Sequence, residues 1–374
     1  MRVTVVGGGV AGSACAIALA RIGAQITVYE AYEDPAGPVG SFVSLAVNGL
    51  RALDALGCLE AVQRAGFPVD RQRMWSGRDR LLGDVPRGRR SGDPLRSVTL
   101  MRADLVGVLR EEAKRAGARI LVGRRLSGDR RDPLVGDADL VVGADGIWSA
   151  TRRAVDPAAP RPRYAGLYSI SGVTDGPVRL PGDRHGFNMV FARRGVFIYL
   201  PAPDGIVWWS AQVAAADAPP DVTTVGLAEL AELFAAEKTP LAVLRASSAV
   251  TAATLLHVLP PVKRRHDGHT VLIGDAAHPV GSGQGASMAV EDAVALARAL
   301  SAADTVPAAL AAFDRLRHDR TRKLAKAAAA NRDAKTAGPL ASRLREIVMP
   351  FFFNRLYEKA TGWLYDHDPG KLPA

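Results

Sequence analysis

The chain has 374 residues, of which 48% are hydrophobic and 23% are charged, and its formal net charge is +10. This length suggests about two domains with a large core, and no apolar run reaches the ~18 residues that a membrane span needs. The only two cysteines, Cys15 and Cys58, stand outside any CxxC or histidine-rich cluster. We therefore predict that both are reduced and that they bind no metal.

The first thirty residues contain a complete strand–turn–helix–strand pattern. Residues 2–6 are β-branched and predict a buried strand, residues 7–12 read GGGVAG, residues 13–22 predict a helix, and residues 24–30 predict a second strand that ends on an acid. Because the first strand follows Met1 directly, we expect no signal or transit peptide and a cytoplasmic protein.

This GxGxxG unit predicts a dinucleotide site. Gly7 permits the tight turn, Gly9 lets a pyrophosphate approach the backbone, and Gly12 lets the helix pack on the strand. The helix N-terminus at Val10 and Ala11 offers free N–H groups to the phosphates. Glu30 is placed to accept hydrogen bonds from an adenosine ribose. The unit alone does not distinguish NAD from FAD.

The elements that follow alternate between helix and strand up to residue 143. In chain order we predict a Pro/Gly-rich loop at 34–40, a helix at 48–59, strands and loops over 67–97, an amphipathic helix at 102–116, and strands at 119–122 and 138–143. The last strand is wholly apolar, as a buried parallel strand should be.

The pattern changes near residue 164, where short strand-like runs alternate with turns. We predict strands at 166–173, 186–191, 196–200 and 206–213, a helix at 223–238, a buried strand at 269–273, a helix at 286–300, and further helices from residue 306. The sequence thus predicts an α/β nucleotide-binding domain interrupted by a mainly antiparallel sheet.

Two further motifs identify the dinucleotide. Residues 143–152 read GADGIWSATR, residues 274–279 read GDAAHP, and the chain continues through GQGASM at 283–288 to EDA at 291–293. With the N-terminal GxGxxG, these motifs resemble the three fingerprints of the class A flavoprotein monooxygenases, the para-hydroxybenzoate hydroxylase-like family. The resemblance covers most of the chain and implies FAD as cofactor and NAD(P)H as co-substrate.

The resemblance refines the predicted fold and its domains. It implies a Rossmann-like FAD-binding domain formed by residues 1–70, 98–160 and 262–330. A mainly antiparallel substrate domain of residues 71–97 and 161–261 interrupts it, and residues 331–374 form a C-terminal helical segment.

Several residues of these motifs are expected to hold FAD. Asp275 ends a buried strand and can accept from ribityl hydroxyls, while Gly283 and Gly285 permit close approach of the ring. The helix that starts near Ala286 and Ser287 directs its dipole at the negative charge of a reduced flavin. The predicted cofactor-binding residues are Gly7, Gly9, Val10, Ala11, Gly12, Glu30, Arg102, Asp145, Gly274, Asp275, Gly283, Gly285, Ala286 and Ser287. Arg152 either pairs with Asp145 or fixes its loop.

Substrate and catalytic residues depend on strand register, which the sequence does not fix. The candidates for substrate contact are Asn188, Tyr199, Trp209 and Pro279, and the candidates for catalysis are Tyr199, Gln212 and His278. His278 is either a proton shuttle or part of the loop scaffold. Trp208 and Trp209 are either a pocket wall or sheet core.

Basic residues are concentrated at 71–102 and 315–345. No RRM, helix-turn-helix or zinc-finger pattern accompanies them, so we exclude nucleic acid as a partner. A solvated basic face, attraction of anionic ligands and docking of an acidic protein stay open, as do a monomer and a homodimer.

By the chemistry of the resembled family, the predicted activity is hydroxylation of a small aromatic or polyketide-like substrate by O₂ through a flavin C4a-hydroperoxide. An FAD-dependent oxidase or reductase on the same scaffold, without oxygen insertion, is the alternative. A flavin-binding regulator without turnover is a third possibility.

Overall fold

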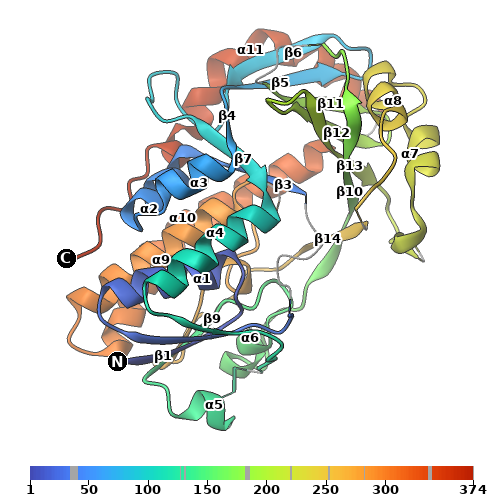
Figure 1. The fold of residues 1–374 in the computed structure, drawn as a ribbon. Helices are drawn as coiled ribbons and strands as arrows, with labels where there is room; N and C mark the ends of the chain where they lie inside the picture. Colours follow the sequence, from blue (N-terminus) through green and yellow to red (C-terminus); the bar gives the residue numbers. More distant parts are fainter. Residues whose placement is uncertain are drawn as a thin grey trace.

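The computed structural model describes residues 1–33, 41–126, 128–129, 132–181, 186–219, 221–251, 253–281, 283–335 and 339–373, with side chains left out at 133, 331, 333–335 and 339–343. The loop predicted at 34–40 lies outside these residues. The described strands form three sheets of five, seven and three strands. Helices cover the five-stranded sheet and extend along the C-terminal part of the chain (Figure 1).

The five-stranded sheet is entirely parallel. Its order is β15 (Thr270–Leu272), β9 (Leu140–Gly143), β1 (Arg2–Val6), β2 (Gln25–Tyr29) and β8 (Arg119–Leu121). One face packs on α1 (Val10–Arg21), α4 (Arg102–Arg115) and α9 (Gly285–Ala302), and the other lies toward α5 (Pro133–Gly136) and α6 (Ala150–Val155). Val5 faces the first set of helices and Val6 faces α5, as strand alternation requires.

A small antiparallel sheet lies beside this domain. It consists of β3 (Phe42–Leu45), β7 (Ser97–Met101) and β4 (Phe67–Val69). The single helix predicted for 48–59 is wrong, because α2 (Val47–Ala55) and α3 (Leu59–Ala65) are separate helices. Gly57 has a φ of +65°, and this left-handed conformation turns the chain between them.

The seven-stranded sheet is mixed and mainly antiparallel. Its order is β14 (Thr254–Val258), β10 (Arg163–Pro177), β13 (Ile206–Ala214), β12 (Gly195–Pro201), β11 (Gly186–Ala192), β5 (Arg71–Ser76) and β6 (Leu81–Pro86). Only the β11–β5 pair is parallel. With the parallel sheet and the C-terminal helices, this arrangement confirms the predicted fold class.

The helix predicted at 223–238 is also wrong. The chain forms a 3-10 turn, η1 (Val222–Thr224), and two short helices, α7 (Leu227–Leu233) and α8 (Lys238–Arg245). Gly226 is extended where α7 begins, and Phe234 ends that helix while packing on the ring of Phe197 in the sheet. Burial of Phe234 against the sheet therefore interrupts the predicted helix.

Two long helices complete the chain. α10 (Val306–Lys335) packs against α9, and α11 (Pro339–Tyr365) runs along β6 at the margin of the mixed sheet (Figure 1). Met349, Phe353 and Tyr357 on α11 pack on Met74 and Leu82 of β5 and β6. None of the described helices has both the length and the apolar composition that crossing a membrane requires.

Candidate cofactor and substrate site

The loop between β1 and α1 can accept no side chain at two of its three motif glycines. A Cβ on Gly7, whose φ is +103°, would lie 2.5 Å from the carbonyl oxygen of Ala144, and a Cβ on Gly12 would lie 1.8 Å from that of Gly7. A Cβ on Gly9 would meet nothing within 4 Å. Gly7 and Gly12 thus bring β1, β9 and α1 together, and Gly9 leaves the N-terminus of α1 open to a ligand.

Glu30 lies at the end of β2 and holds this loop. Its Oε2 accepts a hydrogen bond from the Gly8 N–H at 2.7 Å, and its Oε1 accepts from the Tyr32 N–H at 2.9 Å. The side chain is buried. Each carboxylate oxygen has a second acceptor position, so the residue can fix the loop and still accept from a ribose hydroxyl.

The short η2 turn (Gly274–Ala276) places the GDAAHP motif of residues 274–279 against the N-terminal GxGxxG motif. Gly274 has a φ of +55°, and a Cβ there would lie 2.8 Å from the Cβ of Ala11 on α1. The Asp275 side chain is accessible to solvent. Within the described part of the chain, neither its carboxylate nor the Arg102 guanidinium has a hydrogen-bond or ion-pair partner.

The pKa of the Asp275 carboxyl depends on the protein packed around it and on two charged neighbours, His278 and Arg102. Dense surrounding protein raises the pKa of this carboxyl, and the nearby charges of His278 and Arg102 act in the opposite direction. An accessible carboxylate and an accessible guanidinium without partners are suited to the polar groups of a bound cofactor.

The segment that leads into α9 is open at its glycines. Gly283 has a φ of +121° and open space around it, and a Cβ on Gly285 would lie 3.6 Å from the Asp275 carboxylate. One turn into α9, the Ser287 hydroxyl is buried and has no hydrogen-bond partner among the described residues. Pro279 and Ala286 are partly buried at the two ends of this segment.

The loop after β9 is organised by Asp145 and Arg152. Asp145 Oδ2 accepts from the N–H groups of Ala150 and Thr151 at 2.8 and 3.0 Å, which caps α6. Its Oδ1 is buried with no hydrogen-bond partner in the part of the chain that the structure describes. Arg152 does not pair with Asp145. It donates to the carbonyl oxygens of Ala276 and Ile147 at 2.9 and 2.6 Å, so it fixes this loop against η2.

A buried ion-pair network lies behind the η2 turn. Asp292 on α9 accepts from the Gly274 N–H at 2.9 Å, contacts His278 Nε2 at 2.6 Å, and accepts from Arg317 Nε on α10 at 2.7 Å. Burial acts to raise the pKa of Asp292, but His278 and Arg317 outweigh it and the pKa is lowered. The His278 Nδ1 atom is buried, and no described residue forms a hydrogen bond with it.

The neighbouring Glu291 extends this network to two other elements. Its carboxylate accepts from Arg317 and Arg320 of α10 and from Asn48 Nδ2 of α2 at 2.7 Å. Burial would raise the pKa of Glu291, but the two arginines lower it. The sequence motif contains Glu291 and Asp292, but their partners on α10 carry no motif, so sequence reasoning missed them.

Three of the proposed substrate residues share one face of the mixed sheet. Register places Tyr199 opposite both Asn188 and Trp209. The Tyr199 hydroxyl donates to the Pro181 carbonyl oxygen at 3.0 Å, and burial raises its pKa. Trp209 Nε1 donates to Ser247 Oγ at 2.9 Å, and Asn188 Oδ1 accepts from Trp75 Nε1 at 2.9 Å. Tyr199 and Trp209 belong to the core under α7 and α8, away from the small sheet.

The opposite face carries Gln212 together with Trp208. The Trp208 ring lies 6.2 Å from Phe42 of β3 and 5.1 Å from Phe67 of β4. Ser210, between Trp208 and Gln212, has its hydroxyl 3.1 Å from that of Ser169. Of the β-sheet candidates, only Gln212 therefore lies on the face toward the small sheet.

Comparison with known proteins assigns this arrangement. Residues 1–330 match the family model described as an FAD binding domain. The chain belongs to this family. It is 32% identical to aurachin C monooxygenase/isomerase of Stigmatella aurantiaca and 30% identical to 3-hydroxybenzoate 6-hydroxylase 1 of Aquipseudomonas alcaligenes, and each alignment covers 86% of both chains. The fold matches that of Klebsiella pneumoniae HpxO complexed with FAD and uric acid, with a TM-score of 0.82, 22% identity and coverage of 97% of this chain and 95% of that one.

These findings confirm that the protein is an FAD-dependent monooxygenase of the class A flavoprotein type. Its own residues are compatible with FAD, because Gly9 leaves the N-terminus of α1 open and, among the described residues, Asp275 and Arg102 have no hydrogen-bond or ion-pair partner. The individual cofactor and substrate residues stay predictions.

Proposed function

We propose that this monooxygenase uses NAD(P)H and O₂ to hydroxylate a small aromatic compound bound between the mixed sheet and the cofactor loops. The observation that supports the proposal best is the convergence of distant segments: the open N-terminus of α1 contacts the η2 turn at Gly274, and the adjacent Asp275 lies in the electrostatic field of Arg102. Bound FAD would supply hydride acceptance from NAD(P)H and the activation of O₂.

The roles of the chain around the cofactor follow from their contacts. Gly9 and the α1 N-terminus would receive the pyrophosphate, Glu30 the adenosine ribose, and Asp275 the ribityl hydroxyls. Arg102 would place positive charge beside the cofactor. The N-terminus of α9, with the unpartnered Ser287 hydroxyl, would stabilise negative charge on the reduced ring.

The substrate wall that we propose is the face that carries Phe42, Trp208, Ser210 and Gln212. Its aromatic rings can pack on a flat substrate, and its hydroxyl and amide groups can orient a substrate hydroxyl or carbonyl. This face also carries the Phe187 ring, and the Arg87 guanidinium lies 3.7 Å from the centre of that ring. We assign His278 a positioning role, because its Nε2 contacts Asp292 and both contact the η2 turn.

The test is NAD(P)H consumption by the FAD-loaded protein across a panel of monocyclic and bicyclic aromatic compounds, with isotopically labelled O₂ and product mass measurement. We expect substrate to accelerate flavin reduction and one labelled oxygen atom to enter the product. Stoichiometric hydrogen peroxide with unlabelled product would establish the oxidase alternative. Release of FMN instead of FAD on denaturation would contradict the role of Glu30.

A further inference from the structure

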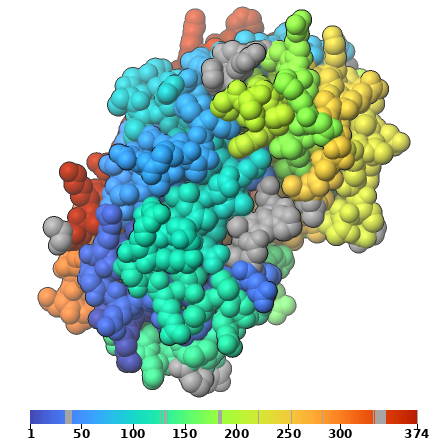
Figure 2. Space-filling view, in the orientation of Figure 1, coloured from blue at the N-terminus to red at the C-terminus, as the bar shows by residue number. Residues whose placement is uncertain are grey.

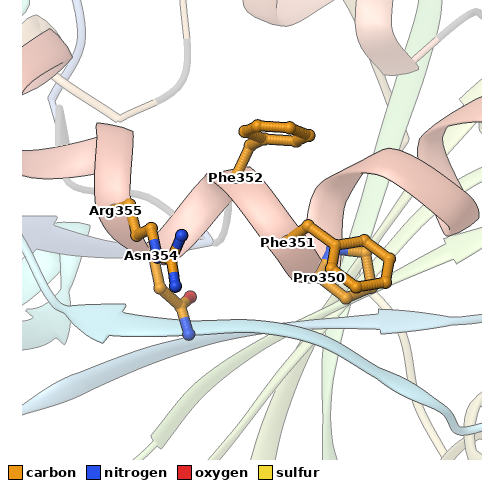
Figure 3. A pocket seen from close by; sticks show the side chains of 5 residues that line it. All are labelled: Pro350, Phe351, Phe352, Asn354 and Arg355. Atoms are coloured by element: carbon orange, nitrogen blue, oxygen red, sulfur yellow. The ribbon is translucent and has the colours of Figure 1, made fainter.

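An exposed apolar stripe runs along α11, away from the cofactor loops. Six side chains between 41% and 69% exposed form it, namely Leu344, Ile347, Val348, Phe351, Phe352 and Leu356. Their spacing of three and four residues places them on one side of the helix. Figure 3 shows Phe352 standing out from α11, whereas Asn354 points toward the neighbouring strand. Large apolar groups so arranged mark an interaction surface.

The inner side of α11 is already occupied. Met349, Phe353 and Tyr357 pack on β5 and β6, and Asn354 Oδ1 accepts from the Asp84 N–H of β6 at 3.0 Å. α11 is thus apolar on both sides, and only one side is covered by the described residues. Large apolar side chains that are left uncovered in this way mark a surface that binds a second apolar environment.

Two cationic side chains lie within the apolar stripe, on the same side of α11. Arg355 and Lys359 follow Phe351 at intervals of four residues, and both are exposed. Arg355 also lines a hollow of about 440 Å³ with Phe351 and Phe352. The two acids of the described part of α11 are less exposed, and Glu358 accepts a hydrogen bond from the Ser91 N–H at 3.0 Å. The exposed charge within this stripe is therefore positive.

We propose that this stripe binds the surface of an anionic phospholipid bilayer. The phenylalanine and aliphatic side chains would enter the interface, and Arg355 and Lys359 would contact lipid phosphates. A second copy of the chain fits less well, because pairing two such stripes would cover four cations with apolar side chains and bring together two chains of net charge +10. Red side chains from the last part of the chain stand out at the upper margin of Figure 2.

The test is co-sedimentation of the FAD-loaded protein with phosphatidylcholine vesicles that contain or lack phosphatidylglycerol. We expect binding only to the anionic vesicles, weakened by salt. Replacing Phe351→Ser together with Phe352→Ser should weaken it about tenfold or more, and Arg355→Gln with Lys359→Gln should remove the preference for anionic lipid. The control is Leu316→Ser, which removes a side chain that is 61% exposed on α10 outside the stripe, and it should bind like the unaltered protein.

Three outcomes would overturn the proposal: no binding of the unaltered protein to anionic vesicles, binding that survives both paired substitutions, or a concentration-dependent dimer that the Phe351→Ser/Phe352→Ser variant dissociates. The last would make the stripe an interface between copies. FAD content and circular dichroism of each variant report folding. Because neither phenylalanine lies in the cofactor loops, NAD(P)H oxidation tests the proposed function separately.

Discussion

The parallel-sheet half and the mixed-sheet half of this molecule differ in how well local sequence indicates the role of a side chain. In the first, contiguous motifs indicate the roles: Gly7 and Gly12 leave no room for a Cβ, and Asp275 lies in the η2 turn three residues after the buried strand β15. In the second, adjacent residues have opposite surroundings. Trp208 contacts Phe42 of the small sheet, and Trp209 stacks on Phe197 beneath α7 and α8.

This difference follows from where loops and strands direct their side chains. A loop at the end of a strand presents its residues to one place, so sequence order is enough to locate them. A strand alternates its side chains between two faces, so a shift of one residue exchanges wall and core. We therefore expect single substitutions in the motifs of the parallel-sheet half to change cofactor binding. In the mixed sheet, we expect the effect of a substitution to depend on which face of the sheet that position occupies.

The largest effect is expected where α9 of the parallel-sheet half meets α10. Arg317→Leu leaves Glu291 and Asp292 buried without their shared cation, which should lower the free energy of unfolding by roughly 3–5 kcal/mol. Thermal denaturation of the FAD-loaded variant measures this loss. A neighbouring exposed residue gives the control, since Arg322→Leu removes only a surface pair with Asp319 and should leave stability nearly unchanged.

The same network predicts an acid dependence. The pKa values of Glu291 and Asp292 are lowered in the folded protein, so their ionised forms stabilise the fold above the ordinary carboxyl range. This stabilisation is lost as pH falls below about 4, where the unfolded chain takes up protons. Arg317→Leu should flatten this acid slope in denaturant titrations at several pH values, and an unchanged slope would show that the pair with Arg317 does not lower these pKa values.

The tryptophan pair tests the assignment of faces. Trp209→Ala should cost roughly 3–5 kcal/mol of stability by opening a cavity beside Phe197, with little change in the KM for the substrate found by the screen. Trp208→Ala should cost less stability, because Trp208 is only partly buried, and should raise KM. Denaturation midpoints and steady-state kinetics of both variants decide the point. A reversed pattern would place the substrate on the α7–α8 side.

Asp275→Ala tests the motif-bearing half. Loss of a charge-assisted hydrogen bond to the cofactor should cost about 1.5–3 kcal/mol, or about ten- to a hundredfold in FAD affinity. Fluorescence titration of the apoprotein with FAD measures it. Stability without FAD should not fall, since this carboxylate has no hydrogen-bond or ion-pair partner in the described part of the chain. FAD affinity equal to that of the unaltered protein would remove Asp275 from the site.

The smallest effect is expected at Ser210. Its hydroxyl lies 3.1 Å from those of Ser169 and Ser171, so Ser210→Ala should cost about 0.5–1.5 kcal/mol in substrate binding if that hydroxyl orients the substrate. We expect the KM for the substrate to rise and the FAD affinity to stay the same, as measured by steady-state kinetics and FAD titration. Ser247→Ala, which removes the partner of Trp209 on the other face, is the matched control and should leave KM unchanged.

The sequence by itself determined the elements whose signals are local. The strand, glycine turn and helix of residues 2–21, the apolar strand that ends at Gly143 and the helix that begins near Gly285 agree with the structure closely. Each depends on hydrophobic period and on glycines that the nearby backbone requires. The cofactor class followed from three such motifs in order.

Only the tertiary structure decided what depends on distant partners. The split at Gly57, the breaks around α7, the side of the sheet that Trp208 and Trp209 face, and the pairing of α9 carboxylates with Arg317 and Arg320 all depend on packing between segments far apart in the chain. Periodicity within a segment records how its side chains alternate, but it does not specify which face meets another element. For this reason the loops that we predict to hold FAD could be chosen from the sequence alone, and the face that we propose as the substrate wall could not.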